Sequence, residues 1–172
     1  VTTKEKGKFA VLDYNLIKIT KATIGCVTSS GEKDSQDMGR TMAPAAAMTL
    51  KQHLEDFNLT PSDYDLIVTG DLSLYGSKVF VDILKEYLID VENVYQDCGL
   101  MIYDIEKQKV SAGGSGCGCA SLVMYGYLCN QLYQKKYNKI LVIATGALLN
   151  PVMVAQGKKI PSIAHAVALE RS

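Results

Sequence analysis

The segment that most constrains the fold of this chain is an apolar one that follows a glycine-rich run. The run reads SAGGSGCGCAS over residues 111–121, and the segment LVMYGYLCNQLY that continues it contains no charged residue. Between Ala120 and Leu132 apolar side chains cover every side of a helix, and such a helix has to be buried on all sides. A two-layer domain cannot enclose it, so the sequence predicts a sheet on both of its faces or a second subunit.

Strand and helix patterns alternate along the rest of the chain. We expect strands at 8–14, 16–27, 65–71, 139–146 and 164–170, and helices at 44–57, 77–87 and 117 to about 133. The strands at 65–71 and 139–146 are apolar runs that end at or next to a glycine, which is typical of buried strands with a loop at the carboxyl end. This alternation predicts an α/β fold with a layered sheet.

Three further segments complete this outline. In the strand at 16–27, Ile17, Ile19 and Ile24 form an apolar pattern that a half-buried strand would show. The segment 29–41 is polar and predicts a loop, whereas 94–103 follows no regular period and predicts an irregular connection.

Length and charge narrow the class of protein. A chain of 172 residues is long enough for one substantial core. Its 18 basic and 18 acidic residues balance, so we expect no nucleic-acid partner. No apolar run reaches the roughly 20 residues that a membrane span requires, and we expect a soluble chain without a transmembrane segment.

The cysteines are odd in number and scattered, which predicts free thiols. They are Cys26, Cys98, Cys117, Cys119 and Cys129. Cys117 and Cys119 are separated by a single residue, which is closer than the common zinc spacing, and a second pair is missing, so we expect no metal site. Two buried thiols are the simplest interpretation, while a thiol pKa lowered by the helix start keeps a redox or acyl-acceptor role open for Cys117.

Motifs spread over nearly the whole chain carry a resemblance to a known family. They are DMGRTMAPAAA at 37–47, YDLIVTGDLS at 64–73, DCGLMIY at 97–103, AGGSGCGC at 112–119, ATGALL at 144–149 and IPSIAH at 160–165. Each is weak alone, but the set is specific. The chain resembles the C-terminal half of the stage V sporulation AD family, within the thiolase-like superfamily of spore-forming Firmicutes.

The resemblance implies a thiolase-like fold of two similar halves in five layers: helix, sheet, helix, sheet, helix. The apolar helix would lie in the central layer and the sheet would be mixed. Residues 1–14 would then be the last strand of an N-terminal half, and residues 15–172 the C-terminal half. We therefore expect the chain to belong to a longer protein whose first half is missing here.

The resemblance also bears on catalysis. Condensing enzymes of this superfamily carry a cysteine nucleophile in the first half, and a histidine and a second histidine or asparagine in the second half, which polarise a thioester carbonyl. The two positions of the second half fall here at Gly70-Asp71 and within Gly113 to Ser115, without imidazole or side-chain amide. The resemblance therefore implies no catalytic residue in this chain and no cofactor.

The family is associated with uptake of dipicolinic acid into the forming spore, so the resemblance implies a binding site for this planar dianion. The expected ligand-binding residues are Gly114, Ser115, Gly116, Cys117, Asp71, Ser73 and His165. The amides at a helix start and the helix dipole favour an anion, with Ser115 as a further donor. An acidic Asp71 repels a free dianion and suits its calcium chelate better. Close packing of two central helices is the alternative explanation for the glycines.

Other interpretations stay open at this point. His165 fits a pocket or a core position equally well, and His53 is expected to be structural. The chain could instead belong to a degenerate acyltransferase of the thiolase superfamily, or to a structural subunit of the spore transport complex. The expected partners are other stage V sporulation A proteins at the spore inner membrane, to which the protein would be peripheral, and a second copy in a homodimer.

Overall fold

A single mixed sheet organises the chain. The computed structural model describes residues 17–114 and 116–171. The strands are β1 (Ile17–Ile24), β2 (Leu66–Thr69), β3 (Tyr95–Asp97), β4 (Lys139–Ala147) and β5 (Ser162–Arg171), in the spatial order β1-β5-β4-β2-β3. β2 is parallel to β3 and β4, whereas β5 is antiparallel to β4 and β1. The predicted α/β fold with a mixed sheet is confirmed; the strand expected at 8–14 lies outside the described residues.

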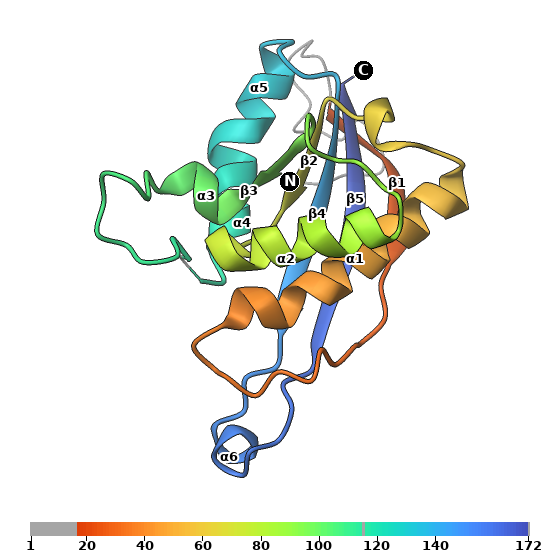
Figure 1. Cartoon of the computed structure of the whole chain (residues 1–172). Coiled ribbons are helices and arrows are strands. Elements are labelled where there is room, and N and C mark those ends of the chain that lie inside the picture. Colours follow the sequence, from red (N-terminus) through yellow and green to blue (C-terminus); the bar gives the residue numbers. More distant parts are fainter. Residues whose placement is uncertain (1–16, 115, 172) are drawn as a thin grey trace, which may run out of the picture.

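Helices lie on both faces of this sheet (Figure 1). One layer consists of α1 (Met38–Phe57) and α2 (Ser73–Glu86), and the other of α3 (Cys98–Ile102), α4 (Cys119–Val123), the π-helical turn η2 (Met124–Leu128) and α5 (Cys129–Tyr133). A 3-10 turn, η1 (Pro61–Asp63), precedes β2, and α6 (Pro151–Ala155) lies between β4 and β5. Alternate residues of β2 face opposite layers, since Ile67 packs with the first and Leu66 and Val68 with the second.

The α1–α2 layer is closely packed because its contact residues are small. Buried alanines line α1, and Gly39 of α1 lies against Gly76 of α2. A β-carbon added at Gly76 would lie 2.6 Å from the carbonyl carbon of Gly39, so only glycine allows the helices this close. Phe80 and Leu84 of α2 fill the space beside them and are fully buried.

The α4–η2–α5 layer is covered on one side only. Val123, Leu128 and Leu132 are buried on the side that packs with the sheet. On the other side Leu122 is 64% exposed and Tyr125 is 73% exposed. The predicted apolar helix is therefore present, but the second covering layer that its sequence requires is not among the described residues.

Several expected boundaries were wrong. α1 begins at Met38 rather than at Pro44, because the Asp37 side chain accepts a hydrogen bond from the Arg40 amide at 3.1 Å and caps the helix there. The helix expected at 77–87 begins at Ser73. The segment 94–103 contains β3 and α3 instead of an irregular connection, and α6 was not predicted.

The apolar pattern predicted for β1 was right at Ile17, which is partly buried against the core, and wrong at Ile19 and Ile24. Ile19 is 54% exposed and Ile24 is 86% exposed, whereas Thr23 is buried. The cause is a polar contact, since the Thr23 hydroxyl lies 2.8 Å from Nδ1 of the buried His53. On the covered face of β1, the polar contact between Thr23 and His53 therefore takes the place of the apolar contacts predicted for Ile19 and Ile24.

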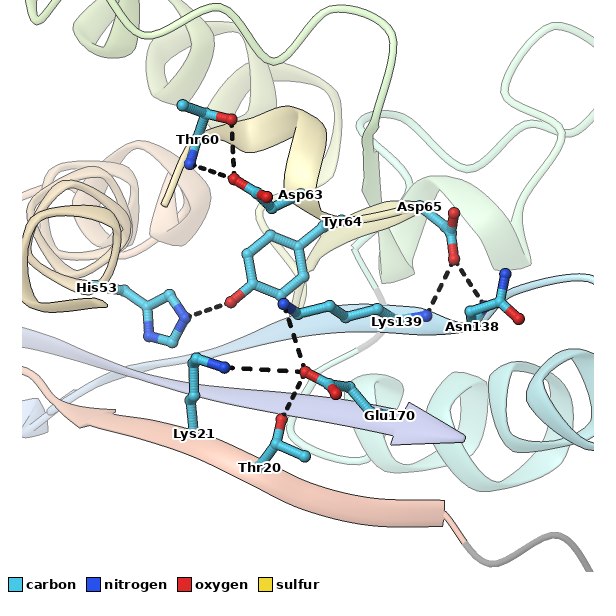
Figure 2. A network of polar contacts seen from close by, with 10 residues as sticks. All are labelled: Thr20, Lys21, His53, Thr60, Asp63, Tyr64, Asp65, Asn138, Lys139 and Glu170. Carbon is cyan, nitrogen blue, oxygen red and sulfur yellow. Dashed lines mark hydrogen bonds and ion pairs between the residues drawn. The ribbon is translucent and has the colours of Figure 1, made fainter. Parts of the chain in front are cut away.

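His53 ties three elements together, and Figure 2 shows its contact with Tyr64. Its Nδ1 contacts Thr23 of β1, and its Nε2 lies 2.6 Å from the hydroxyl of Tyr64, which follows η1. Burial, followed by the charge of Lys21, lowers the pKa of His53 from 6.5 to about 4. The imidazole is therefore neutral near pH 7, and it serves as a structural link between α1, β1 and the start of β2.

Candidate functional site

A cavity of about 780 Å³ opens at the carboxyl ends of β2 and β4. Its walls include five of the expected site residues, namely Asp71, Ser73, Gly114, Gly116 and Cys117. The start of α1, residues 110–112 and residues 145–147 also line the cavity. Ligands of α/β sheets bind at such strand ends, so the position and the size of this cavity both suit a small molecule.

The Asp71 carboxylate bridges two walls of the cavity. Its Oδ2 accepts a hydrogen bond from the Gly116 amide at 2.8 Å. Gly113 and Gly116 both have φ of +84°, a conformation that glycine adopts without strain. The Gly116 amide, which the sequence analysis assigned to an external anion, is therefore already bonded to Asp71.

A second carboxylate, Asp97, lies behind this loop and is buried. Its two oxygens accept from the Thr69 hydroxyl at 2.7 Å and from the amides of Leu72 at 2.8 Å, Ser73 at 3.0 Å and Gly99 at 3.0 Å. Burial raises the pKa of Asp97, while the bonds from Thr69, Leu72 and Ser73 oppose that rise. Asp97 thereby fixes the turn that presents Asp71 and Ser73, where Ser73 has φ of +56°.

The floor between β2 and β4 leaves no room for a side chain at position 70. A β-carbon added at Gly70 would lie 2.9 Å from Oγ1 of Thr145 and 3.2 Å from its amide nitrogen. Thr145 lines the cavity, and its hydroxyl has no hydrogen-bond partner among the described residues. Gly70 thus keeps the two strand ends in contact.

The charge of the cavity wall is negative. Among the described residues that line it, Asp34, Asp37 and Asp71 are acidic, and none is lysine, arginine or histidine. Arg40 pairs with Asp37 at 3.0 Å, which offsets one of these charges from outside the wall. A free dianion would therefore meet net repulsion at the cavity wall.

Two of the expected site residues do not join the others. Ser115 lies outside the described residues. His165 is exposed on β5 opposite Ala144, and its Nδ1 accepts a hydrogen bond from the Gly25 amide at 3.1 Å. His165 does not line the cavity, because its side chain is used at the β1–β5 edge of the sheet.

The two neighbouring cysteines of the glycine-rich run have different environments. Cys117 is exposed and lines the cavity, so its predicted burial was wrong, whereas Cys119 is buried in an apolar cluster. Buried Cys98 packs in the same apolar cluster, and burial raises the pKa of its thiol to about 12. Of these three thiols, only Cys117 is accessible from the cavity.

Sequence reasoning missed Asp97, Thr145 and the constraint on Gly70. Gly70 directly follows β2, Asp97 ends β3 and Thr145 lies near the end of β4, so all three are at the edge of the sheet where Asp71 lies. Once β2 and β4 were predicted, the polar residues after them could have been grouped at one edge. Asp97 could not be predicted in this way, because β3 is only three residues long and its segment was interpreted as irregular.

The whole set of motifs can be compared with known proteins. The sequence matches the family of stage V sporulation protein AD over residues 6–170. This chain belongs to that family. The stage V sporulation protein AD of Bacillus subtilis (strain 168) is 53% identical to it over 156 residues, which are 91% of this chain and 46% of that protein. The chain thus spans about half the length of this curated relative.

Solved structures confirm the fold at much lower identity. A variant of OleA from Xanthomonas campestris is similar with a TM-score of 0.50 and 10% identity, over 91% of this chain and 58% of that one. A second OleA variant gives a TM-score of 0.50 with 11% identity, over 91% and 56%. The family member described here therefore has the α/β fold of thiolase-like proteins.

Proposed function

We propose that this chain binds dipicolinic acid for uptake into the developing spore and does so without catalysis. The observation that carries the proposal is the cavity of about 780 Å³ at the strand ends, lined by Asp71, Ser73, Gly114, Gly116 and Cys117. A planar ring with two carboxylates is small enough for it, and the wall offers both backbone amides and a hydroxyl. Membership of a sporulation family supports this ligand over other small acids.

The negative wall favours the calcium chelate over the free dianion. Three carboxylates line the cavity and no cationic side chain among the described residues does. Calcium neutralises the two carboxylates of dipicolinate and accepts six to eight oxygen ligands, so it retains positions for protein oxygens or water. A carboxylate such as that of Asp71 then becomes an attractive neighbour instead of a repulsive one.

The geometry at Gly70 supports binding without chemistry. The resemblance would place a catalytic histidine at Gly70-Asp71, and at Gly70 a side chain would have to displace Thr145. Neither of the chain's histidines lines the cavity. An acyl-transfer role would therefore have to use Cys117, the accessible thiol of the cavity, without a histidine from the described part of the chain.

The proposed setting is a complex at the spore inner membrane. In it this chain is the C-terminal half of a longer protein and works with other stage V sporulation A proteins. Two observations support a larger assembly: the chain spans 46% of its Bacillus subtilis relative, and Leu122 and Tyr125 are exposed on an apolar helix. A structural subunit without ligand is the competing role.

Calorimetry of the protein at its full natural length tests the proposal. Titration with dipicolinate in the presence of calcium is expected to give saturable heat, and titration without calcium a weaker response. Cys117→Phe places a ring in the cavity and should weaken binding at least tenfold. Cys26→Phe is the matched control, because Cys26 is an exposed cysteine that does not line the cavity.

The outcomes separate the candidate roles. Absence of heat at millimolar ligand with a cooperatively folded protein overturns dipicolinate binding. Turnover of acyl-CoA thioesters would instead support an acyltransferase. If neither occurs and spores carrying Cys117→Phe still accumulate dipicolinate, the protein is a structural subunit.

A further inference from the structure

The connection between β4 and β5 projects away from the sheet (Figure 1). Several of its apolar side chains are exposed. We call residues 148–159, which include α6, the hairpin tip. Leu148 is 68% exposed, Val152 is 64% exposed, and Leu149 and Met153 are exposed by nearly half. Four exposed apolar side chains within six residues form a contiguous apolar surface, which soluble proteins generally reserve for contacts.

The hairpin tip is a folded element with its own hydrogen bonds. Oδ1 of Asn150 accepts from the amides of Val152 at 3.0 Å and Met153 at 3.1 Å and caps α6. The Lys158 amide donates to the Met153 carbonyl at 2.9 Å and closes the turn. The apolar side chains are therefore held outward by an ordered backbone.

The hairpin tip is positively charged. Lys158 and Lys159 follow α6 and are exposed, and the sequence contains no acidic residue from Ile140 to Leu169. At the base of the tip, the Ile160 amide donates to the Glu32 carbonyl at 3.0 Å. That neighbouring loop carries Glu32, Lys33 and Asp34, so its net negative charge offsets part of the positive charge of Lys158 and Lys159.

We propose that the hairpin tip docks on the surface of an anionic lipid bilayer. Apolar side chains on a short ordered element enter the interface between headgroups and acyl chains, and flanking lysines are attracted by anionic headgroups. The exposed apolar side of α4, η2 and α5 differs in this respect, since residues 119–133 include no charged side chain. That side suits an apolar protein surface, whereas the tip combines the two features that a charged membrane surface recognises.

Docking by the tip does not require a spanning segment. No helix in the described ranges 17–114 and 116–171 is long and apolar enough to cross a membrane. The tip also lies apart from the cavity, as none of residues 148–159 lines it. Lipid binding is therefore a separate property from dipicolinate binding and can be measured separately.

Co-sedimentation of the full-length protein with vesicles tests this inference. Vesicles of phosphatidylglycerol and phosphatidylcholine are expected to bind the protein, and phosphatidylcholine alone to bind it much more weakly. The double substitution Val152→Ser with Met153→Ser should reduce the partition coefficient more than tenfold. Each of Lys158→Gln and Lys159→Gln should reduce it about fivefold at low salt.

The matched control is Lys51→Gln with Lys85→Gln, which removes two lysines from α1 and α2 and should leave vesicle binding unchanged. Binding that is indifferent to the tip substitutions, or equal for neutral and anionic vesicles, overturns the inference. So does a result in which Val152→Ser with Met153→Ser dissolves a dimer and leaves vesicle binding intact. Dipicolinate heats recorded on the same variants distinguish a failure here from a failure of the cavity proposal.

Discussion

The two faces of the sheet bury their helices to very different extents, although the helices of the less buried face contain no charged residue. On one face, α1 and α2 form a closed layer in which alanines, Phe80 and Leu84 are fully buried. On the other, α4, η2 and α5 bury one side against β2 and β4 and leave Leu122 and Tyr125 in solvent. We call the α1–α2 layer the closed layer, because its contact residues are buried within this chain. We call the α4–η2–α5 layer the open layer, because one apolar side of it is exposed among the described residues.

The difference shows where the stability of the chain resides. In the closed layer, α1 and α2 approach so closely at Gly39 and Gly76 that a larger residue at either position would clash with the backbone of the other helix. In the open layer, a β-carbon added at Gly126 would meet no atom of the described residues within 4 Å beyond its own helix turn. Substitutions should therefore be costly on one face and nearly silent on the other.

The same substitution on the two faces should give the largest contrast. Leu84→Ala removes a fully buried side chain of α2 and should lower the free energy of unfolding by about 2 to 5 kcal/mol. Leu122→Ala, on α4, should change it by less than about 0.5 kcal/mol in this chain. Urea unfolding of both variants measures the two values. A large loss for Leu122→Ala in this chain alone would show that the open layer is already covered, for instance by a second copy.

Glycine substitutions sharpen the contrast. A β-carbon at Gly76 would meet the backbone of Gly39 at 2.6 Å, so Gly76→Ala should cost about 1 to 3 kcal/mol by forcing α1 and α2 apart. Gly126→Ala has space and should stabilise the helix by up to about 1 kcal/mol. Thermal unfolding followed by circular dichroism gives both signs, and a stabilising Gly76→Ala would contradict the closed packing.

Acid should weaken the closed layer through His53. Its pKa is about 4 in the folded chain and 6.5 ordinarily, so the unfolded state binds more protons between these values. The stabilisation is complete above pH 6.5 and is lost as the pH falls toward 4; from pH 7 to pH 5 the loss should be about 2 kcal/mol. Denaturant midpoints across this range measure it. His53→Gln should flatten the dependence, and an unchanged slope would assign it to other groups.

The smallest effect on stability and the clearest effect on association are expected at the open layer. Tyr125→Lys should change the free energy of unfolding by less than about 0.5 kcal/mol and should suppress self-association of this chain. Met48→Lys is a matched control, because Met48 is an exposed apolar residue on α1 of the closed layer. Sedimentation velocity compares them. A clean monomer before any substitution would argue against a covering partner for this surface.

The sequence predicted the positions of the main strands better than it predicted which residues of a strand are buried. The strands with strong apolar runs, β2 and β4, were placed correctly because buried parallel strands are recognisable from local composition. In β1, Ile19 and Ile24 were wrongly predicted to be buried. The residue that is buried, Thr23, contacts His53 on α1, and a contact between segments this far apart leaves no local sequence pattern. The start of α1 was missed because Pro44 suggested a first turn, while the cap at Asp37 decided it.

The candidate site was predicted in part for a similar reason. The glycine-rich run and Asp71 follow from the motifs, and the structure places them on one cavity. Their contact at 2.8 Å, between the Asp71 side chain and the Gly116 amide, joins segments far apart in sequence and has no local signal. His165 was expected near them because the resemblance places the start of its strand at the mouth of the site, but its side chain accepts a hydrogen bond from the Gly25 amide beside β1.

The shared acceptor at Asp97 has a consequence for the order of folding. Its oxygens receive donors from the end of β2, from the turn at Leu72 and Ser73, and from Gly99 at the start of α3. These groups come within reach only after β2 and β3 have paired, a parallel contact that requires the intervening helix to have docked. The turn that carries Asp71 and Ser73 therefore takes its final shape only once these two strands have paired.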